Sequence, residues 1–296
     1  MSDGARRNQV IGIGLVNLAT LTWATNMTLG RWLRDDIGPI TLAASRFVVA
    51  AAILAVLLQR RPPAERRLGR DRRWLVGMAL SGVVVFGPML YLGLRHTTAV
   101  SATLITGFGP LITGLLAAPL IQEPMTRRQV GGAIVGLAGL VILITGSAAA
   151  SWQGMGVNAG DLIVVGAVIL WSLYSVLGRR VTRRRSTLSA TAWSAFLGLP
   201  LLLVAAVVEV QVVPVDLRPE LLAAIVYIGV VPTVVGVSSW NEGVRRLGSS
   251  GAMVFYNTLP LYGTLLGYLF LGETIGPAHL VGGVLIVGGG LWAARR

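Results

Sequence analysis

The sequence predicts an all-α polytopic membrane protein with ten transmembrane helices arranged as two inverted five-helix repeats. The chain is 54% hydrophobic and only 12% charged, which is about half the charged share of a soluble domain. The apolar residues gather into ten runs, each near the roughly 20 residues that cross about 30 Å of hydrocarbon. One stretch of sequence also occurs twice, as expected of a chain built from two structural halves.

The ten runs occupy most of the 296 residues and leave no room for a separate soluble domain. The first run exceeds the apolar core of a signal peptide and lacks its cleavage site, so we interpret it as a retained span. In chain order the runs cover 9–29, 38–58, 74–94, 98–121, 127–147, 159–178, 188–208, 221–241, 248–271 and 276–294.

The duplicated stretch reads GFGPLITGLLAAPLIQEP in its first copy and YNTLPLYGTLLGYLFLGE in its second. Pro110 and Glu123 recur 150 residues later as Pro260 and Glu273. An earlier stretch, WATNMTLGR, recurs 148 residues later as WSLYSVLGR. These constant offsets predict that the two halves of the chain have the same fold.

We divide the chain into a first repeat, 1–147, and a second repeat, 148–296. Each repeat contains five of the predicted spans, and because five is odd the second repeat lies upside down relative to the first. Inverted repeats of this kind place a substrate site near the middle of the membrane, between the halves.

All 25 basic side chains are arginines, and their placement predicts the orientation of the chain. Twenty of them fall in segments on one side of the spans: the N-terminal head, 59–73, 127–128, 179–185, 245–246 and the last two residues. By the positive-inside rule both termini are cytoplasmic, and we expect a bacterial inner (plasma) membrane protein. The net charge of +13 is split among short loops, so we do not expect nucleic acid as a partner.

Missing residue types exclude several kinds of chemistry. Without lysine the chain has no Walker A loop, and without cysteine it has no disulfide, thiolate nucleophile or iron–sulfur ligand. Its two histidines, His96 and His279, cannot supply a multi-histidine metal site. No Ser/His pair or paired aspartate stands out either. We therefore predict no enzyme activity, no metal site and no cofactor.

Arg46 is the one charge buried within a predicted span. It lies eight residues past Gly38, roughly 12 Å deep at 1.5 Å per residue. Such a residue is a candidate for a functional site that faces the bundle or a wet cavity. The alternatives are that it snorkels or ties down free carbonyls. No Asp or Glu lies in the middle of a span, which favours facilitated diffusion or exchange over tight ion coupling.

Proline residues lie inside five spans: Pro88, Pro110, Pro200, Pro232 and Pro260. Each removes a backbone donor and frees the carbonyl four residues earlier. At Pro110 and Pro260 these are the carbonyls of Thr106 and Tyr256, near the middle of their spans. We predict gating or kinking roles for Pro88, Pro110, Pro232 and Pro260, with kinks needed only for packing as the alternative.

Aromatic and amide side chains recur inside spans one, three, six, eight and nine, including Trp240 and Tyr262. Together they can line an amphipathic pocket, with rings for apolar groups and hydroxyl or amide groups for orientation. For each ring the alternative is the aromatic belt at the membrane interface. The candidate substrate-binding residues are Trp23, Asn26, Arg46, Tyr91, Trp171, Tyr174, Tyr256 and Asn257.

Glu123 and Glu273 each end a span just before the next helix begins. We expect both carboxylates to be solvated and to be stabilised by the N-terminal dipole of that next helix. This is a structural role rather than a catalytic one.

Spans five and ten carry rows of glycine, which permit close helix approach. We predict that they serve packing inside the chain or a homodimer through these two spans. The residues are Gly131, Gly132, Gly136, Gly139, Gly282, Gly283 and Gly288–Gly290.

Taken together, these features resemble the drug/metabolite transporter superfamily and its EamA-type exporters. The resemblance rests on the WATN sequence of span one, the Pro39…Arg46 pattern of span two, the proline and glutamate of spans four and nine, and the glycine-rich spans. It implies a basket-shaped helical bundle, alternating access, and a cavity lined mainly by spans one, three, four, six, eight and nine. Within the group the chain is most similar to the YddG-type exporters of aromatic amino acids.

The second repeat departs from the first where Asn26 aligns with Tyr174 and Arg46 with Ser194, so the halves do not contribute equally to the site. We predict an exporter of amino acids or similar small amphipathic metabolites, in contact with membrane lipid. The alternative is efflux of quaternary cations or drug-like compounds, which the aromatic rings suit through cation–π contacts. The poverty of carboxylates in the middle of the membrane counts against it.

Overall fold

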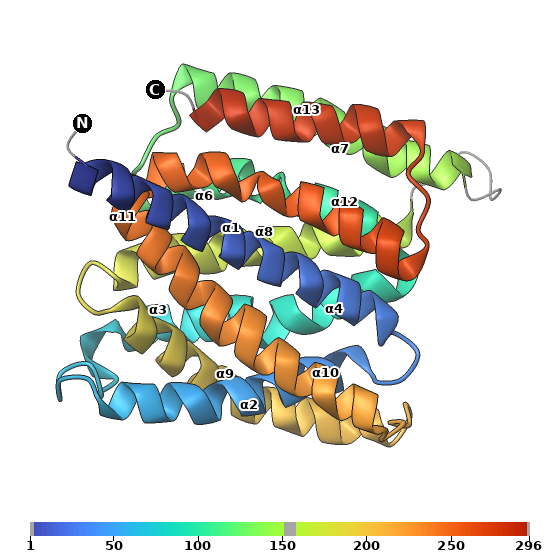
Figure 1. Ribbon diagram of the computed structural model, residues 1–296. Helices are drawn as coiled ribbons and strands as arrows, with labels where there is room; N and C mark the ends of the chain where they lie inside the picture. Colours follow the sequence, from blue (N-terminus) through green and yellow to red (C-terminus); the bar gives the residue numbers. More distant parts are fainter. Residues whose placement is uncertain (1–2, 151–157, 295–296) are drawn as a thin grey trace.

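The computed structural model describes residues 3–150 and 158–294, and the regular structure within them is helical throughout. Eight helical stretches are long and apolar enough to cross a membrane, and two shorter apolar helices stand where spans nine and ten are predicted. The prediction of an all-α membrane protein is therefore confirmed, and a count of ten spans agrees with these helices (Figure 1).

Six of the predicted spans are single helices. They are α1 (Asp3–Trp32), α2 (Pro39–Gln59), α7 (Arg127–Ala150), α8 (Ala159–Val181), α9 (Thr187–Val210) and α13 (Pro277–Ala294). The predicted boundary of the repeats at 147/148 falls in the last turn of α7, and residues 151–157 of the connection that follows lie outside the described residues.

The other four spans are interrupted or joined. Span three consists of α3 (Arg72–Met78), the π-helical segment η2 (Ala79–Val85) and α4 (Phe86–His96), after the short 3₁₀ helix η1 (Gly69–Asp71). Span four consists of α5 (Ala99–Thr106) and α6 (Gly109–Ile121). Span eight begins with α10 (Pro219–Val230) and the π-helical η3 (Val231–Gly236) and continues into α11 (Val237–Tyr256), and α12 (Thr258–Leu271) completes span nine.

Helix α11 differs from the prediction, which placed a loop between residues 241 and 248. The chain stays helical there and carries both the end of span eight and the start of span nine. Glu242 pairs with Arg245 three residues on and with Arg246 four residues on. Ion pairs at these spacings stabilise a helix, which explains why a polar stretch did not form a loop.

Contacts between helices repeat in a crossed pattern that relates the two halves. Span one packs along span eight (α1 with α11), and span six packs in the same way along span three (α8 with α4 and η2). Spans two and seven pair with each other (α2 with α9), as do spans five and ten (α7 with α13). Exchange of the halves leaves this pattern unchanged, as inverted repeats require.

Two glycines show how closely the halves correspond. A Cβ atom added at Gly93 would lie 2.6 Å from Cγ2 of Val164, and one added at Gly243 would lie 2.5 Å from Cγ2 of Val16. Gly93 and Gly243 are 150 residues apart, and Val16 and Val164 are 148 apart. The offsets found in the sequence therefore mark matching contacts between helices.

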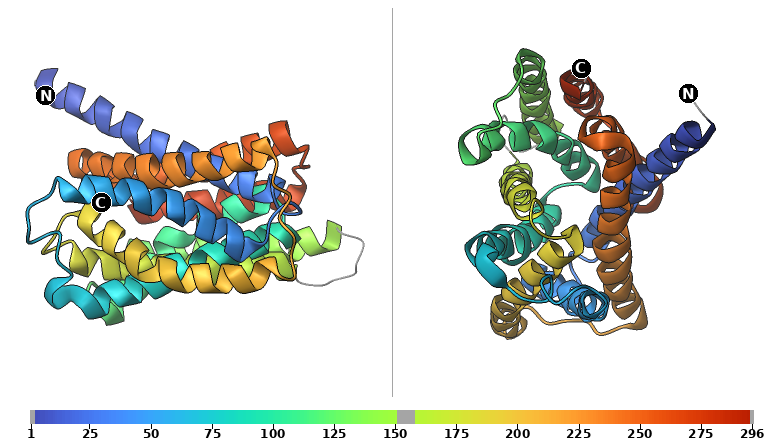
Figure 2. Two further views of the ribbon diagram at one scale, coloured as in Figure 1. Left: turned by 90° about the horizontal axis from the view of Figure 1, so that it is seen from below. Right: turned by 90° about the vertical axis from the view of Figure 1, so that its left-hand side faces the viewer.

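The glycine rows of spans five and ten pack against each other inside the chain. A Cβ added at Gly132 would lie 2.4 Å from the carbonyl oxygen of Gly289, and one added at Gly139 would lie 2.7 Å from that of Gly282. Figure 2 shows α7 and α13 side by side at the rim of the bundle. These faces are thus covered within one chain, and a homodimer through the two spans stays a prediction.

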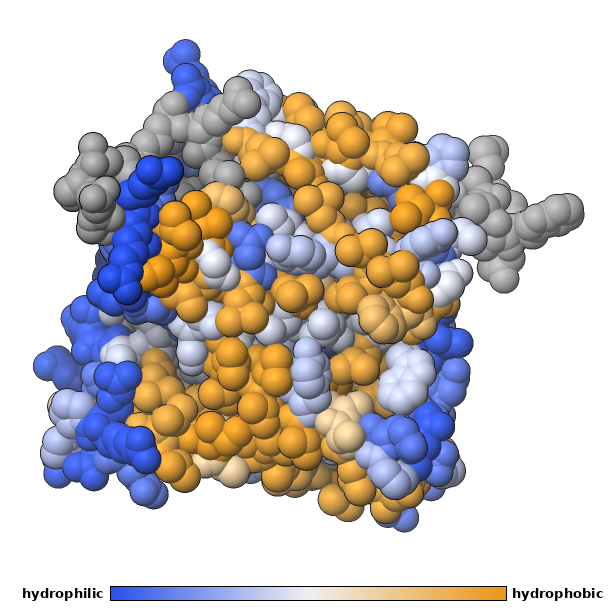
Figure 3. Space-filling model, viewed as in Figure 1, coloured by the Kyte–Doolittle hydropathy of each residue, from blue (hydrophilic) through white to orange (hydrophobic). Residues whose placement is uncertain are grey.

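The arginine-rich segments among the described residues gather at one end of the molecule, which we call the basic end. The start of α1 and the end of α13 lie there too (Figure 1), and the other end is called the far end. Between the two ends apolar side chains cover the face seen in Figure 3. Strongly exposed examples are Val204, Val207, Val208, Phe270 and Val284. Such a surface suits contact with lipid.

Candidate functional site

A central cavity of about 90 Å³ lies between the halves of the chain. Since a water molecule needs about 10–15 Å³ of such volume, the cavity has room for several waters or for a small polar group. Spans one to four and six to nine all contribute to its wall. The family resemblance implied six of these eight spans, and spans two and seven add Arg46, Phe47, Thr191 and Ser194.

Aromatic rings from four spans meet on one side of this cavity. The ring centroid of Trp23 lies 6.4 Å from that of Trp171, 5.5 Å from that of Trp240 and 6.1 Å from that of Tyr256. Trp171 in turn stacks on Tyr174 at 5.1 Å. Such spacings are typical of favourable aromatic pairs. The predicted rings of spans one, six, eight and nine therefore form one cluster.

The indole of Trp23 is held in place by the backbone of span eight. Its Nε1 donates a hydrogen bond of 3.2 Å to the carbonyl oxygen of Pro232, within the π-helical segment η3. A π-helical turn shifts the backbone pairing from i−4 to i−5, and Thr233 Oγ1 accordingly donates to the carbonyl of Ile228, five residues back. The irregular backbone of span eight thus meets the aromatic cluster directly.

A second, larger hollow of about 760 Å³, which we call the vestibule, lies between the aromatic cluster and the basic end. Its wall includes Arg61, Arg179, Glu242 and Arg245 near that end. Seven residues line both the vestibule and the central cavity: Trp23, Trp171, Tyr174, Thr191, Thr233, Val237 and Tyr256. These shared residues, four of them aromatic, form the boundary between the two spaces.

Three polar side chains form a buried chain of hydrogen bonds beside the central cavity. The hydroxyl of Tyr91 donates to Oδ1 of Asn26 over 2.8 Å and accepts from Nη1 of Arg46 over 3.1 Å. The guanidinium of Arg46 also lies over the rings of Phe47 and Tyr91, at 4.7 Å and 5.6 Å from their centroids. Of these residues Arg46, Asn26 and Phe47 line the cavity.

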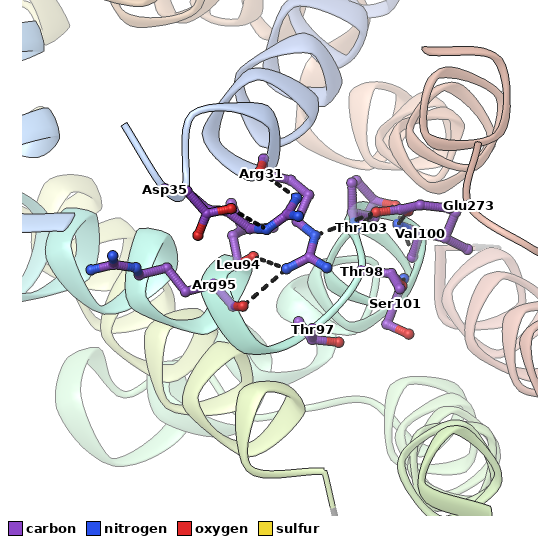
Figure 4. Close-up of polar contacts among 12 residues, drawn as sticks. Arg31, Asp35, Leu94, Arg95, Thr97, Thr98, Val100, Ser101, Thr103 and Glu273 are labelled. Atoms are coloured by element: carbon purple, nitrogen blue, oxygen red, sulfur yellow. Dashed lines mark hydrogen bonds and ion pairs between the residues drawn. The ribbon is translucent and has the colours of Figure 1, made fainter. Parts of the chain in front are cut away.

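The far end of the molecule is closed by a set of contacts that we call the Arg31–Glu273 latch (Figure 4). Nη1 of Arg31 donates to the carbonyl oxygens of Leu94 and Arg95 over 2.8 Å and 3.0 Å. Nε of Arg31 lies 3.8 Å from the carboxylate of Glu273. That carboxylate accepts the backbone N–H groups of residues 99 and 100, at 2.8 Å and 2.9 Å. The latch joins α1, α4, α5 and the end of α12.

Further contacts reinforce the closure of this end. Glu209 of α9 accepts the N–H groups of residues 40 and 41 at the start of α2, over 3.2 Å and 2.7 Å. The hydroxyl of Thr97 donates to the carboxylate of Asp161, and Arg218 pairs with Asp36. The structure is therefore open toward the basic end and shut at the far end.

The prediction for Glu273 was wrong in two respects. Its side chain is only 8% exposed, and the helix N-terminus that it caps belongs to α5, not to the helix that follows it. The contact joins residues far apart in the sequence, so a local pattern did not reveal it. Glu123 is 43% exposed and pairs with Arg179 and Arg183, which agrees with the solvated position predicted for it.

Four of the five predicted prolines stand where the spans are irregular. Pro110 and Pro260 lie in the first turns of α6 and α12, just after the chain leaves the preceding helix. The residues at those two breaks, Thr106 and Tyr256, line the central cavity. Pro232 lies inside η3, and Pro88 follows η2 by three residues. Pro200 lies within the uninterrupted helix α9.

The structure brings together most of the predicted site residues but not all of them. Trp23, Asn26, Arg46, Trp171, Tyr174 and Tyr256 line the central cavity, and Tyr91 supports it from behind. Asn257 instead faces Gly290 of α13, where an added Cβ would lie 2.8 Å from its Oδ1. Tyr262 donates to Oδ1 of Asn17 over 3.0 Å and joins α12 to α1.

Several residues that line the cavity were not identified from the sequence. Thr191, Ser194 and Thr233 are small hydroxyl residues of a kind common in all the spans. Gly82 makes room for a predicted ring, since a Cβ at this position would lie 2.2 Å from Cδ2 of Tyr174. Ser194 carried a signal, because it aligns with Arg46 in the other repeat.

A scan against protein families matches both halves of the chain to the EamA-like transporter family, over residues 10–145 and 158–294. Among similar proteins is the uncharacterized transporter YyaM of Bacillus subtilis, 28% identical over 96% of this chain and 93% of that protein. A probable terminal-alkyne amino-acid exporter of Streptantibioticus cattleyicolor is 28% identical over 94% of this chain and 92% of its own length.

Another relative is the S-adenosylmethionine/S-adenosylhomocysteine transporter of Chlamydia trachomatis, 26% identical over 94% of this chain and 88% of that protein. A solved crystal structure aligns over 99% of this chain and 97% of its own, with a TM-score of 0.62 and 25% identity. These relatives are transporters and not enzymes. Because the family matches both halves, the chain belongs to the EamA-like transporter family of multi-pass membrane proteins.

Proposed function

We propose that this protein exports amino acids or similar small amphipathic metabolites across the inner membrane by alternating access. The observation that carries the proposal is the central cavity, which lies between inverted repeats and combines a polar end with an aromatic wall. The polar end orients a polar head group, and the rings contact an apolar side chain of variable size. A relative named as a probable amino-acid exporter supports the same substrate class.

The vestibule gives this transport a direction of loading. We place the basic end in the cytoplasm, with both termini, because arginine-rich loops are retained on that side. With the vestibule reaching this end and the latch shut at the far end, the structure corresponds to a state that loads from the cytoplasm. Rocking of one repeat against the other then exposes the cavity at the far end.

Transport without ion coupling is the simplest mechanism for this cavity. None of the described residues that line it is an aspartate or a glutamate. A buried carboxylate is the usual carrier of a coupled proton or sodium ion. We propose facilitated diffusion or exchange. The competing function, efflux of quaternary cations, draws support from the aromatic cluster around Trp23, because aromatic rings attract such cations. In this cavity, however, the cation would lie beside the positive charge of Arg46.

Counterflow in proteoliposomes tests the proposed function. Proteoliposomes with labelled phenylalanine outside and unlabelled phenylalanine inside should accumulate label transiently, without a pH or sodium gradient. Trp23→Ala, Trp171→Ala and Tyr256→Ala should each weaken competition by phenylalanine by about 5- to 150-fold, because each removes apolar contact worth about 1–3 kcal/mol. Competition by threonine should weaken less, since its small side chain makes less contact with the rings.

Trp193→Ala serves as the matched control, because this tryptophan packs with Phe196 and does not line either hollow. It should leave the competition unchanged. Folded variants of the three cavity rings that compete like the unaltered protein would place the rings in packing alone. Uptake of a quaternary cation in the absence of any amino-acid counterflow would support the competing function.

A further inference from the structure

We propose that Arg46 binds a carboxylate of the substrate, and that the cavity selects small monocarboxylates with an apolar tail by this group rather than by an ammonium. Amino acids are members of this class, and so are carboxylic acids that lack the amine. The inference rests on the proposed function, since it names what the same cavity recognises.

Arg46 is a buried cation without a protein counter-ion. It is 6% exposed, and the ion pairs among residues 3–150 and 158–294 do not include it. Its Nε is buried with no hydrogen-bond partner, and its Nη1 donates to the neutral hydroxyl of Tyr91. A buried cation in this state is costly. A guanidinium offers a planar fork of donors that fits the two oxygens of a carboxylate.

The remainder of the wall does not favour a positive ligand group. Within the described part of the chain, Arg46 is the only charged side chain that lines the cavity. A carboxylate would neutralise it in a site of low dielectric, where such an attraction is strong. An amine without a carboxylate would add a second positive charge beside the first. Hydroxyl groups, the amide of Asn26 and the rings remain to hold the ammonium of an amino acid.

The size of the cavity fits this division of roles. About 90 Å³ holds a head group but not a large side chain as well, so the tail must extend past the residues shared with the vestibule. Those residues include the rings of Trp23, Trp171 and Tyr256. The polar anchor and the apolar wall thus lie in the order that an amphipathic monocarboxylate requires.

Three compounds with one phenyl tail separate the two head groups. We would compare 3-phenylpropionate, phenylalanine and 2-phenylethylamine as competitors of labelled phenylalanine counterflow, and as ligands that raise the melting temperature of the purified protein. Both carboxylates should compete and stabilise, and the amine should do neither at matched concentration. In Arg46→Gln the carboxylates should lose at least about 10-fold in apparent affinity, as expected for a charge-assisted hydrogen bond.

Tyr91→Phe is the matched control, because it removes the hydroxyl that Arg46 contacts and keeps the cation. It should retain most of the preference for carboxylates. Two results would overturn the role of Arg46 and leave the proposed function standing. In the first, phenylalanine shows counterflow but the amine is its best competitor. In the second, a folded Arg46→Gln variant ranks the three competitors as the unaltered protein does. Absence of counterflow for every carboxylate tested would count against the function itself.

A different observation carries a second inference: the geometry points to a matching latch at the basic end, formed by Glu123 and Arg179 when that end closes. Arg179 is the partner of Arg31 at the offset of 148, and Glu123 is the partner of Glu273 at 150. The two charges are already in contact, with Nη1 of Arg179 3.1 Å from the carboxylate of Glu123.

Both glutamates leave their helices in the same way. The residues before them adopt left-handed backbone conformations, with φ of 58° at Gln122 and 63° at Gly272. The N–H of Glu123 donates to the carbonyl of Ala117 over 3.4 Å, and that of Glu273 donates to the carbonyl of Gly267 over 3.2 Å. These two acceptors are again 150 residues apart.

The two ends differ in the backbone that faces the glutamate. At the closed end Glu273 caps a helix N-terminus, and at the open end there is no helix N-terminus at the matching position. At the far end residues 97–98 separate α4 from α5, and Glu273 accepts the N–H groups of residues 99 and 100. The matching residues 247–248 lie within the continuous helix α11. We infer that α11 opens at this point as the basic end closes, and that Glu123 then caps residues 249 and 250.

The sequence suits such a break. Residues 247–251 read LGSSG, and glycine and serine are both favoured at the start of a helix. Carboxylate caps on two backbone N–H groups are charge-assisted hydrogen bonds, so each latch favours the state in which its own end is shut. The two states then differ in which latch is complete.

Because the chain has no cysteine, a single cysteine can report on the vestibule. In a Ser238→Cys background, Glu273→Gln should slow maleimide labelling at least about threefold, because it weakens the state that is shut at the far end. Adding Glu123→Gln should restore the rate, since the opposite latch is then weakened too. Glu220→Gln, which removes an exposed carboxylate outside both latches, should not restore it. A double variant as slow as Glu273→Gln alone, or no slowing by Glu273→Gln, would overturn the inference.

Discussion

Replacing Glu273 with alanine should destabilise the protein by about 3 kcal/mol, because it removes the partner of three groups at once. Two backbone N–H groups at the start of α5 lose their acceptor, and Arg31 loses its counter-charge. The carboxylate is 8% exposed, so water replaces it poorly. For a chain of 296 residues the loss corresponds to a decrease in melting temperature of roughly 5 °C.

Thermal and denaturant unfolding of the purified protein in detergent, followed by tryptophan fluorescence, measure this effect. Glu123→Ala is the matched control, because it removes the same side chain at the equivalent place in the other repeat. Glu123 is 43% exposed and pairs with arginines that are themselves exposed, so its loss should cost less than about 1 kcal/mol. Similar losses in the two variants would contradict the asymmetry of the latches.

The second large effect should come from one added methyl group between α7 and α13. A Cβ at Gly289 would lie 2.6 Å from the carbonyl oxygen of Gly132, and two backbones cannot yield as a flexible side chain can. Gly289→Ala should therefore force the helices apart, at a cost of about 2–3 kcal/mol. Loss of folded protein in detergent and a lower melting temperature are the expected results.

The adjacent residue provides a control of opposite sign. Nothing lies within 4 Å of a Cβ added at Gly288. Gly288→Ala should stabilise α13 by about 0.5–1 kcal/mol, because alanine loses less conformational freedom in a helix than glycine does. Equal destabilisation by the two substitutions would show that α7 and α13 do not pack as described.

The architecture was predictable because its signals are periodic or repeated. The apolar runs predicted the spans, and the offsets of 150 and 148 predicted matching contacts such as those of Gly93 and Gly243. The polar stretch 242–247 was misassigned to a loop, since its charges form ion pairs along a helix. Hydropathy records that a residue is charged, but it does not record whether a partner lies one helical turn away.

The site was predictable in its types of residue more than in its contacts. Trp23, Trp171 and Tyr256 were identified because large rings inside apolar spans are few, and Arg46 because it is the one charge at that depth. Asn257 was assigned to the pocket on its residue type, but it lies at the junction of α11 and α12, where its side chain faces Gly290. Glu273 was assigned to the wrong helix because its contact with α5 joins positions more than 170 residues apart.

The π-helical segments η2 (Ala79–Val85) and η3 (Val231–Gly236) have a consequence for the rotational phase of spans three and eight. A π turn accommodates one residue more than an α turn, and one residue corresponds to a rotation of about 100° in an α-helix. Leu75 and Met78 precede η2 and pack with Leu177 and Val181, while Tyr91 follows it and faces Arg46. Each half therefore carries one extra residue in its π-helical segment, and this residue keeps the side chains at both ends of the span directed toward the core. Deleting a single residue from η2 would turn α3 away from α8 without changing the hydropathy of the span.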